Sequence, residues 1–200
     1  MTNIQALIIE SGRNLIMSRG YNGFSYADVS QVIGIRKASI HHHFPTKADL
    51  ACAVVAQSRA VIKAQTEILT AGEAEPDEQL REYVTYWEEC IADGTAPFCI
   101  AAMLASELPT LPPVLAAEVR AHFVDLSGWL ETIMKRGAAL GRFKLAASAR
   151  VEADGFMSTV YGAMLTARAY GQAAIFGDIV QAALVRLAAA DGAILIGNDG

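Results

Sequence analysis

Apolar residues recur at helical spacing along most of the chain, and few stretches alternate between apolar and polar residues as strands do. Glycine and proline residues interrupt this pattern at intervals typical of helix ends. The pattern predicts an all-α fold of about nine helices. Two short helices are expected within residues 25–44, and the others over about 3–18, 47–70, 76–92, 97–107, 113–139, 146–170 and 175–190.

The stretch from Ser25 to Phe44 carries the most specific local signals. Ser25 is a good helix cap, and Asp28 suits the first turn, where a carboxylate meets the positive end of the helix. Gly34 fits a left-handed turn because it has no Cβ atom to clash. Ile40 and Phe44, four residues apart, lie on one face of a second short helix. The stretch is therefore predicted to be a helix-turn-helix, whose second helix lies in the major groove of DNA.

The remaining side chains of this motif are rich in donors for phosphates and base edges. Thr46 is expected to cap the next helix, with Lys47 in its first turn. A cation there opposes the helix dipole, whereas a phosphate against the helix end would be stabilised. We therefore predict DNA contacts from a set of residues on and beside the motif. They are Ser25, Tyr26, Arg36, Lys37, Ser39, His41, His42, Thr46 and Lys47.

An ordered series of residues between about 4 and 57 has a known counterpart. It comprises Ile8, Leu15, Ile16, Gly20, Tyr21, Gly34, Ile35, Ile40, His43, Phe44, Pro45, Thr46, Lys47, Asp49 and Leu50. In these residues the segment resembles the N-terminal domain of the TetR family of bacterial transcriptional repressors. Arg36 and His41 depart from the pattern, since the family usually has a small capping residue and a tyrosine there. The resemblance implies a DNA-binding domain over 1–50 and an effector-binding and dimerisation domain over 51–200.

The distribution of charge agrees with a DNA-binding N-terminus. The chain has a net charge of −5 over its 200 residues. Its first 50 residues hold five basic and three acidic side chains, a net charge of +2, so the remaining 150 carry −7. This asymmetry indicates a basic DNA-binding part on an acidic body.

Composition favours a cytoplasmic protein without a membrane segment. Hydrophobic residues make up 53% of the chain, yet no apolar run approaches the roughly 18 residues of a membrane span. The first residues do not show a basic region followed by an apolar stretch of signal-peptide length. Three cysteines without a paired spacing fit a reducing compartment.

The helices expected over about 146–170 and 175–190 are rich in alanine, glycine and small apolar residues. Small residues let helices approach closely, which suits either an internal core or a subunit interface. The resemblance implies the second, a homodimer through these two helices. A twofold dimer places two DNA-binding heads on successive major grooves, so a palindromic double-stranded operator is expected.

Aromatic residues and methionines on the expected helices of the body have two interpretations. At helical spacing such residues are usually plain core. The resemblance instead implies a cavity for a small-molecule effector, whose chemistry the sequence does not identify. The main candidate lining residues are Tyr83, Trp87, Phe98, Met103, Phe123, Trp129, Met157 and Tyr161, with Tyr86, Met134 and Met164 as further candidates. Glu88, Glu107, His122 and Asp125 are polar residues expected to orient a ligand.

Cysteine chemistry offers a second hypothesis for the effector. The segment 98–107 resembles a TetR branch that senses electrophiles and oxidants, and Cys99 falls where that branch has its cysteine, with Cys90 nine residues earlier. A reactive thiol needs a cation or a helix N-terminus to stabilise the thiolate. Cys99 follows Pro97 near a helix start, but no lysine or arginine is close in sequence. A redox sensor and a buried, inert thiol both remain open.

Metal binding and catalysis have little support. His41, His42 and His43 are consecutive, so on a helix they point about 100° apart and do not bind one ion together. The chain has no glycine-rich phosphate loop, nucleophile elbow or paired-histidine zinc motif. We expect no metal, no cofactor and no enzymatic activity, with a helical enzyme as a remote alternative. The leading hypothesis is a repressor that a small-molecule inducer releases from its operator.

Overall fold

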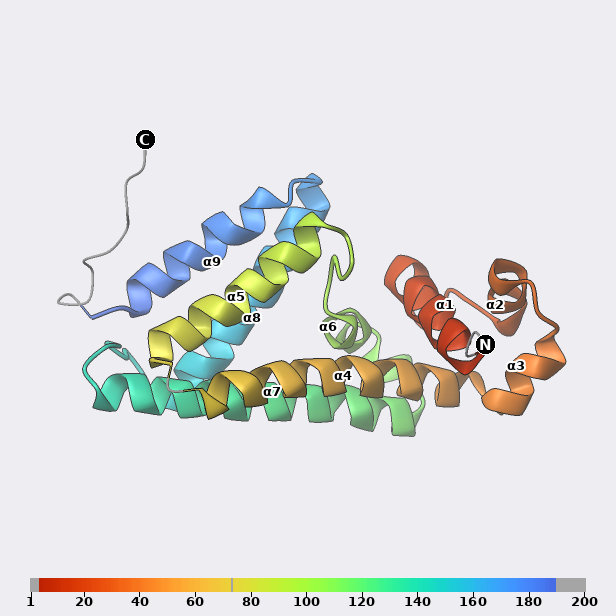
Figure 1. The fold of residues 1–200 in the computed structure, drawn as a ribbon, viewed down its shortest axis with the longest axis horizontal. Coiled ribbons are helices and arrows are strands. Elements are labelled where there is room, and N and C mark those ends of the chain that lie inside the picture. The colour runs from red at the N-terminus through yellow and green to blue at the C-terminus, as the bar shows by residue number, and fades with distance from the viewer. Residues whose placement is uncertain (1–3, 73, 190–200) are drawn as a thin grey trace. The chain divides into compact units, whose positions relative to one another are not determined.

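The computed structural model describes residues 4–72 and 74–189 (Figure 1). Over those residues it is all-α, as predicted, with nine α-helices, one short 3-10 helix and an isolated bridge between Phe143 and Ala188. The helices are α1 (Ile4–Arg19), α2 (Tyr26–Ile33), α3 (Lys37–His43), α4 (Lys47–Ala71), α5 (Pro76–Ala92), α6 (Ile100–Ala105), η1 (Leu108–Thr110), α7 (Pro113–Ala139), α8 (Ala149–Tyr170) and α9 (Ala174–Leu187).

Three helix ends differ from the predicted ones for local reasons. Helix α6 begins only at Ile100, because Cys99 before it has an extended backbone. Helix α8 begins at Ala149 rather than near 146, because Ser148 caps it by accepting a hydrogen bond from the Val151 amide. Helix α9 ends at Leu187, after which Ala188 is extended. Residue 190, the predicted end, lies outside the described residues.

The chain divides into two compact units. The first, which we call the N-terminal unit, holds residues up to 64 together with 98–123, and the second, the C-terminal unit, holds 65–97 and the residues from 124 onward. Both divisions fall inside continuous helices, α4 and α7. The boundary expected after residue 50 likewise lies within α4, which begins at Lys47.

The core of the N-terminal unit joins α1, α3 and the start of α4. Ile8, Ile16, Ile40 and Leu50 are fully buried there. Gly12 permits the close approach of α1 to α4, since a Cβ atom on it would lie 3.1 Å from Cγ of Leu50. The unit thus holds the two short helices α2 and α3 on a packed support.

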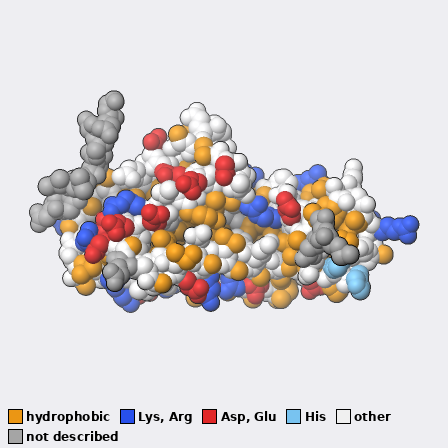
Figure 2. All heavy atoms as spheres, viewed as in Figure 1, with side chains coloured by type: hydrophobic (Ala, Val, Ile, Leu, Met, Phe, Trp, Pro, Cys, Tyr) orange, Lys and Arg blue, Asp and Glu red, His pale blue; other side chains and the backbone are white. Residues whose placement is uncertain are grey.

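In the C-terminal unit α9 packs along α8 and also contacts α5 (Figure 1). Leu80 of α5, Leu130 of α7, Met164 of α8 and Phe176 of α9 are fully buried between these helices. In Figure 2 acidic side chains gather over the part of this unit that α5 forms. No helix within the described part of the chain is long and apolar enough to cross a membrane.

Candidate nucleic-acid interface

Helix α2 begins with the predicted cap. The Ser25 hydroxyl accepts a hydrogen bond from the Ala27 amide at 3.2 Å, and the Ser25 amide donates to Oδ2 of Asp28 at 2.8 Å. Arg19 pairs with the same carboxylate at 3.0 Å. Hydrogen bonds from Ser25, together with Arg19, lower the pKa of Asp28. These contacts fix where α2 starts, and the exposed Ser25 stays a predicted phosphate contact.

The turn between α2 and α3 requires glycine. Gly34 has φ 70° and ψ 24°, a left-handed conformation that a residue with a side chain adopts only with strain, and its amide donates to the Ser30 carbonyl at 3.0 Å. The Ser30 hydroxyl donates to the Ile35 carbonyl at 2.6 Å. The predicted glycine turn is therefore confirmed.

Helix α3 presents donors on its outer side. Ile40 and Phe44 are buried, whereas Arg36, Lys37 and His42 are exposed. Neither Arg36 nor Lys37 forms an ion pair with any described residue. Figure 2 shows histidine side chains gathered over α3. The start of this helix thus exposes two cations without ion-pair partners, Arg36 and Lys37, and its surface also carries histidine rings and the half-buried Ser39.

His41 is exposed, and the protein fixes one edge of its ring. Its Nδ1 atom lies 3.1 Å from the Pro45 carbonyl oxygen, so this nitrogen carries the proton and donates. The ring packs against Tyr26, with ring centroids 4.8 Å apart. Nε2 is the ring nitrogen left for a phosphate or base edge.

Tyr26 has a structural role that the sequence did not suggest. It is buried, and its hydroxyl bonds the carbonyl oxygens of Phe44 at 2.8 Å and Thr46 at 2.5 Å. Burial, with smaller contributions from Asp49 and Tyr21, raises the pKa of Tyr26 to about 12. The hydroxyl therefore holds α2 against the connection between α3 and α4, and its predicted DNA contact has no support in this geometry.

Lys47 likewise finds partners inside the protein. Its Nζ atom donates to the carbonyls of Tyr21 and Phe24, each at 2.8 Å, and lies 4.4 Å and 4.8 Å from the centroids of their rings. Burial lowers the pKa of Lys47, while the carboxylates of Glu107 and Asp28 act in the opposite direction. Lys47 thus fastens the α1–α2 loop to the start of α4.

At the same helix start, Thr46 forms a cap. Its hydroxyl accepts a hydrogen bond from the Asp49 amide at 3.2 Å, and its amide and hydroxyl donate to Oδ2 of Asp49, each at 2.8 Å. The residue is exposed, so its predicted contact with DNA remains a prediction.

Glu107 holds the other side of the α1–α2 loop. Its carboxylate accepts hydrogen bonds from the amides of Tyr21 at 2.8 Å and Asn22 at 3.1 Å. The Asn22 side-chain amide donates both to Glu107 at 2.9 Å and to the Thr110 hydroxyl at 3.0 Å. The sequence indicated Glu107 only as a residue to orient a ligand, and no local signal pairs it with a loop 85 residues away.

Comparison with known proteins assigns the chain to a family. Residues 8–54 match the model of bacterial regulatory proteins of the tetR family, and residues 76–183 match that of the tetracyclin repressor-like C-terminal domain. The second match alone covers more than half of the chain. The chain belongs to the TetR family of transcriptional regulators. The resemblance seen in the sequence is thereby confirmed.

Solved structures agree with this assignment. A TetR-family transcriptional regulator from Agrobacterium tumefaciens is 54% identical, with a TM-score of 0.89 over 92% of this chain and 97% of that one. A TetR regulator from Legionella pneumophila shares the fold, with a TM-score of 0.83 at 24% identity over 94% and 98% of the two chains.

A curated relative is the HTH-type transcriptional regulator CymR of Pseudomonas putida. It is 25% identical over 135 residues, and the matched part is 66% of this chain and 66% of CymR, just under two thirds of that regulator. The families and relatives are transcriptional regulators and not enzymes, as the sequence predicted.

In this TetR-family regulator the eight main residues predicted to line an effector cavity divide between the two units. Phe98, Met103 and Phe123 belong to the N-terminal unit, and the other five belong to the C-terminal unit. Tyr83 and Trp87 are buried, and the Tyr83 and Trp129 rings lie 5.5 Å apart between centroids. The rest of the C-terminal set, Met157 and Tyr161, lies on α8.

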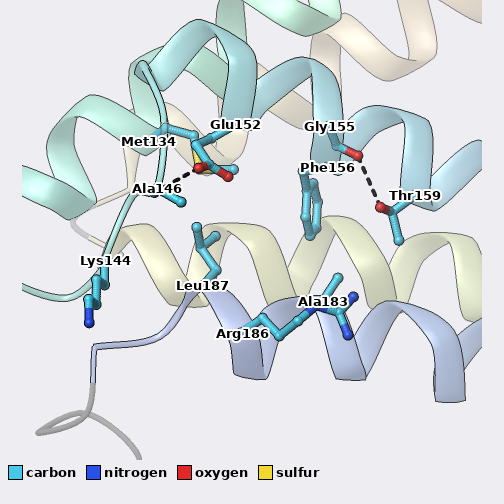
Figure 3. A pocket seen from close by; sticks show the side chains of 10 residues that line it. All are labelled: Met134, Lys144, Ala146, Glu152, Gly155, Phe156, Thr159, Ala183, Arg186 and Leu187. Carbon is cyan, nitrogen blue, oxygen red and sulfur yellow. Dashed lines mark hydrogen bonds between the residues drawn. The ribbon is translucent and has the colours of Figure 1, made fainter.

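A described cavity lies elsewhere in the C-terminal unit. It has a volume of about 340 Å³ and lies between α8, α9 and the loop that follows α7 (Figure 3). None of the eight main candidates lines it, whereas Met134, one of the further candidates, does. The eight residues stay a prediction for the effector site.

Cys99 of the regulator has a partner that the sequence did not reveal. The thiol is buried, and its Sγ atom lies 3.5 Å from Nε2 of the buried His122 on α7. Cys90 is half-buried and lies in the other unit. Among the described residues, no three histidine, cysteine or acidic side chains are placed to hold a metal ion.

Proposed function

We propose that this chain is a cytoplasmic repressor that binds a palindromic operator as a homodimer and releases it when a small molecule binds. Residues 1–50 would form the DNA-binding domain, and residues 51–200 the effector-binding and dimerisation domain. One observation carries the proposal: α3, fixed by the Gly34 turn and the Tyr26 hydroxyl, exposes Arg36 and Lys37 without ion-pair partners among the described residues. Unpaired cations at the start of a recognition helix are suited to phosphates and base edges.

In the proposed complex α3 lies in the major groove. Arg36 and Lys37 at its start, with Ser39, His41 and His42 along it, contact base edges and nearby phosphates. Ser25 and Thr46 stand at the starts of α2 and α4, where helix N-termini favour phosphate. Arg36 and His41, which depart from the family pattern, give this regulator its own operator preference.

The proposed dimer interface is a stripe on α8 with α9 beside it. Exposed residues recur on α8 at spacings of three and four, so they share one face. Two are glycines, Gly155 and Gly162, where a Cβ atom would meet nothing within 4 Å. Gly155 also lines the cavity between α8 and α9. At Gly162 nothing inside the described chain requires glycine, whereas a closely packed partner helix would. The stripe consists of Val151, Gly155, Ser158, Gly162, Leu165 and Ala169.

Two pairs of such helices form a four-helix bundle around a twofold axis. The apolar side chain of Leu165 is 59% exposed and that of Val185 on α9 is 51% exposed. Exposed apolar side chains of this size beside a small-residue stripe are typical of a surface that a second subunit covers.

Release from DNA is proposed to follow from a shift between two spacings of the DNA-binding heads. Helix α4 begins at Lys47 in the proposed DNA-binding domain (residues 1–50) and continues without a break to Ala71, so it is the connection best suited to carry the shift.

The effector site is proposed to lie near Trp87. In the C-terminal unit the Trp87 indole N–H is buried and has no hydrogen-bond partner among the described residues. A ligand acceptor would satisfy this donor, which favours an effector site near Tyr83 and Trp87.

A second candidate function is thiol-based sensing through Cys99, favoured by its contact with His122. In this reaction the thiol proton passes to Nε2 of His122, and the thiolate sulfur forms a bond to the β-carbon of an added Michael acceptor while the C=C π bond breaks. The resulting enolate takes the proton back from His122, which leaves a thioether and a neutral imidazole. N-ethylmaleimide releases the operator from the wild type and not from Cys99→Ser if the hypothesis holds. Equal release from both proteins removes it, and Cys90→Ser serves as the matched control.

The main proposal is tested with DNA from upstream of the coding sequence. The purified chain is expected to retard this DNA in a gel-shift titration and to leave scrambled DNA of equal length unbound at the same concentration. Lys37→Ala should change the preferred sequence, because Lys37 lies at the start of the recognition helix. Equal affinity of the wild type for both DNAs would contradict the proposal.

A further inference from the structure

The cavity in the C-terminal unit has an apolar interior. Figure 3 shows Phe156 pointing from α8 toward α9, and Leu187 pointing from α9 into the space between them. Phe156 and Leu187 are buried, as is Met134 of α7, which also lines the cavity. The volume of about 340 Å³ lies within the range of about 300–1,000 Å³ that small-molecule sites occupy.

The edge of the cavity carries an excess of positive charge. Lys144 and Arg186 both line it and are exposed, and neither forms an ion pair with a residue that the structure describes. Glu152 is the only acidic residue in the lining. Its Oε1 atom accepts hydrogen bonds from the amides of Ala146 at 2.8 Å and Ala147 at 2.9 Å. The Glu152 carboxylate is thus engaged in holding the loop, while the two cations remain available.

We infer that this cavity binds a small organic acid with an extended apolar body, of the class of medium-chain carboxylates. The apolar body lies over Met134, Phe156 and Leu187, where its burial is favourable. The carboxylate stays at the open edge, where the exposed Arg186 offers a bidentate pair of donors. Lys144 lies on the other side of Leu187 in Figure 3 and adds positive charge to the edge without contacting the same carboxylate.

The charges decide between classes of ligand. An amine of the same shape would face Lys144 and Arg186 and find the Glu152 carboxylate already hydrogen-bonded. A neutral alcohol gains the apolar contacts but leaves both cations without a partner. The acid alone satisfies both parts of the cavity, and this inference requires no release of DNA.

The test is a calorimetric titration of the purified full chain with octanoate, compared with octan-1-ol and octylamine. Octanoate is expected to bind one molecule per chain, at least about tenfold more tightly than octan-1-ol, as one charge-assisted hydrogen bond suggests. Lys144→Gln with Arg186→Gln should weaken octanoate binding at least about tenfold. Neither side chain has a partner among the described residues, so the double variant keeps the fold. Arg120→Gln, the same change at an exposed site on α7 outside the cavity, should bind as the wild type does.

Equal affinity for octanoate and octan-1-ol would overturn the inference. So would an unchanged octanoate affinity in the double variant, or no detectable binding by wild-type protein whose helical circular dichroism is intact. Gel shifts without octanoate on the same preparations separate this result from the proposed function. Intact DNA binding without octanoate binding overturns only the cavity inference, and the reverse overturns only the proposed repressor.

Discussion

Glu107 holds Asn22 by two hydrogen bonds to one carboxylate oxygen, one from the backbone amide at 3.1 Å and one from the side-chain amide at 2.9 Å. The second oxygen accepts from the Tyr21 amide at 2.8 Å. Lys47 holds the carbonyls of Tyr21 and Phe24 from the other side. The α1–α2 loop of the DNA-binding head is thus clamped between α4 and the segment that follows α6.

Glu107→Gln should destabilise the fold. The new side-chain amide has one acceptor oxygen for the three N–H donors of Tyr21 and Asn22, and its own NH2 group would face one or more of these donors. Loss of charge-assisted hydrogen bonds of this kind costs about 1–3 kcal/mol in the free energy of unfolding. Urea denaturation followed by circular dichroism measures this. Thr110→Val is the control: it removes the bond from the Asn22 side chain and the one that the Thr110 hydroxyl donates to the Glu107 carbonyl, both neutral and exposed, and leaves the carboxylate bonds intact, so it should cost less than Glu107→Gln. A Glu107→Gln variant as stable as the wild type would show that the clamp contributes nothing.

Lys47→Met is expected to lower stability and to leave the salt dependence of DNA binding unchanged, because its ammonium binds two carbonyls inside the protein. A lysine that contacts a phosphate instead contributes about 0.9 to the slope of log K against log salt concentration. Gel-shift titrations at several salt concentrations distinguish the two roles. If the slope of the variant is shallower than that of the wild type by about 0.9, Lys47 does contact a phosphate, as the sequence suggested.

Alkaline pH should destabilise the DNA-binding domain through ionisation of Tyr26. The pKa of Tyr26 rises from 10.0 to about 12 on folding, so between these values the unfolded chain has lost the proton and the folded chain retains it. Stability is therefore fully present below about pH 10 and falls as the pH rises toward 12. Denaturant titrations at a series of pH values measure this fall. Tyr26→Phe should flatten it, and an identical pH profile in that variant would assign the loss of stability to other groups.

Gly162→Glu should abolish the proposed dimer while sparing the fold, since a Cβ atom at this position meets nothing within 4 Å. Two carboxylates brought together at a twofold interface repel each other and lose solvation. Sedimentation velocity measures the mass in solution. Ala138→Glu, at an exposed position on α7, is the matched control and should sediment as the wild type does. A dimeric Gly162→Glu variant would exclude the α8 stripe as the interface.

The sequence predicted features whose causes lie within a few residues. Ser25 and Asp28 are three residues apart, and Gly34 adopts a left-handed conformation because it has no side chain, so the motif could be recognised from the sequence alone. Glu107 and Asn22 meet only once the chain has folded, as do Cys99 and His122, which are 23 residues apart. No local pattern marks such pairs.

Lys47 and α8 show two other limits of prediction. The position of Lys47 at a helix start indicated a phosphate, yet its long side chain reaches back over the Tyr21 and Phe24 rings. A helical pattern continues through residues 146–148, but Ser148 caps the backbone and moves the start of α8 to Ala149.

The central claim is that α3 reads an operator for a dimer, and a fluorescence anisotropy titration on the chain's own upstream DNA tests it most directly. We expect two chains per palindromic duplex and affinity well above that for scrambled DNA of the same length. Arg36→Ala with Lys37→Ala should remove most of this preference, because both cations are free and exposed on the described surface. Equal affinity of the wild type for operator and scrambled DNA, or a double variant that discriminates as well as the wild type, would contradict it.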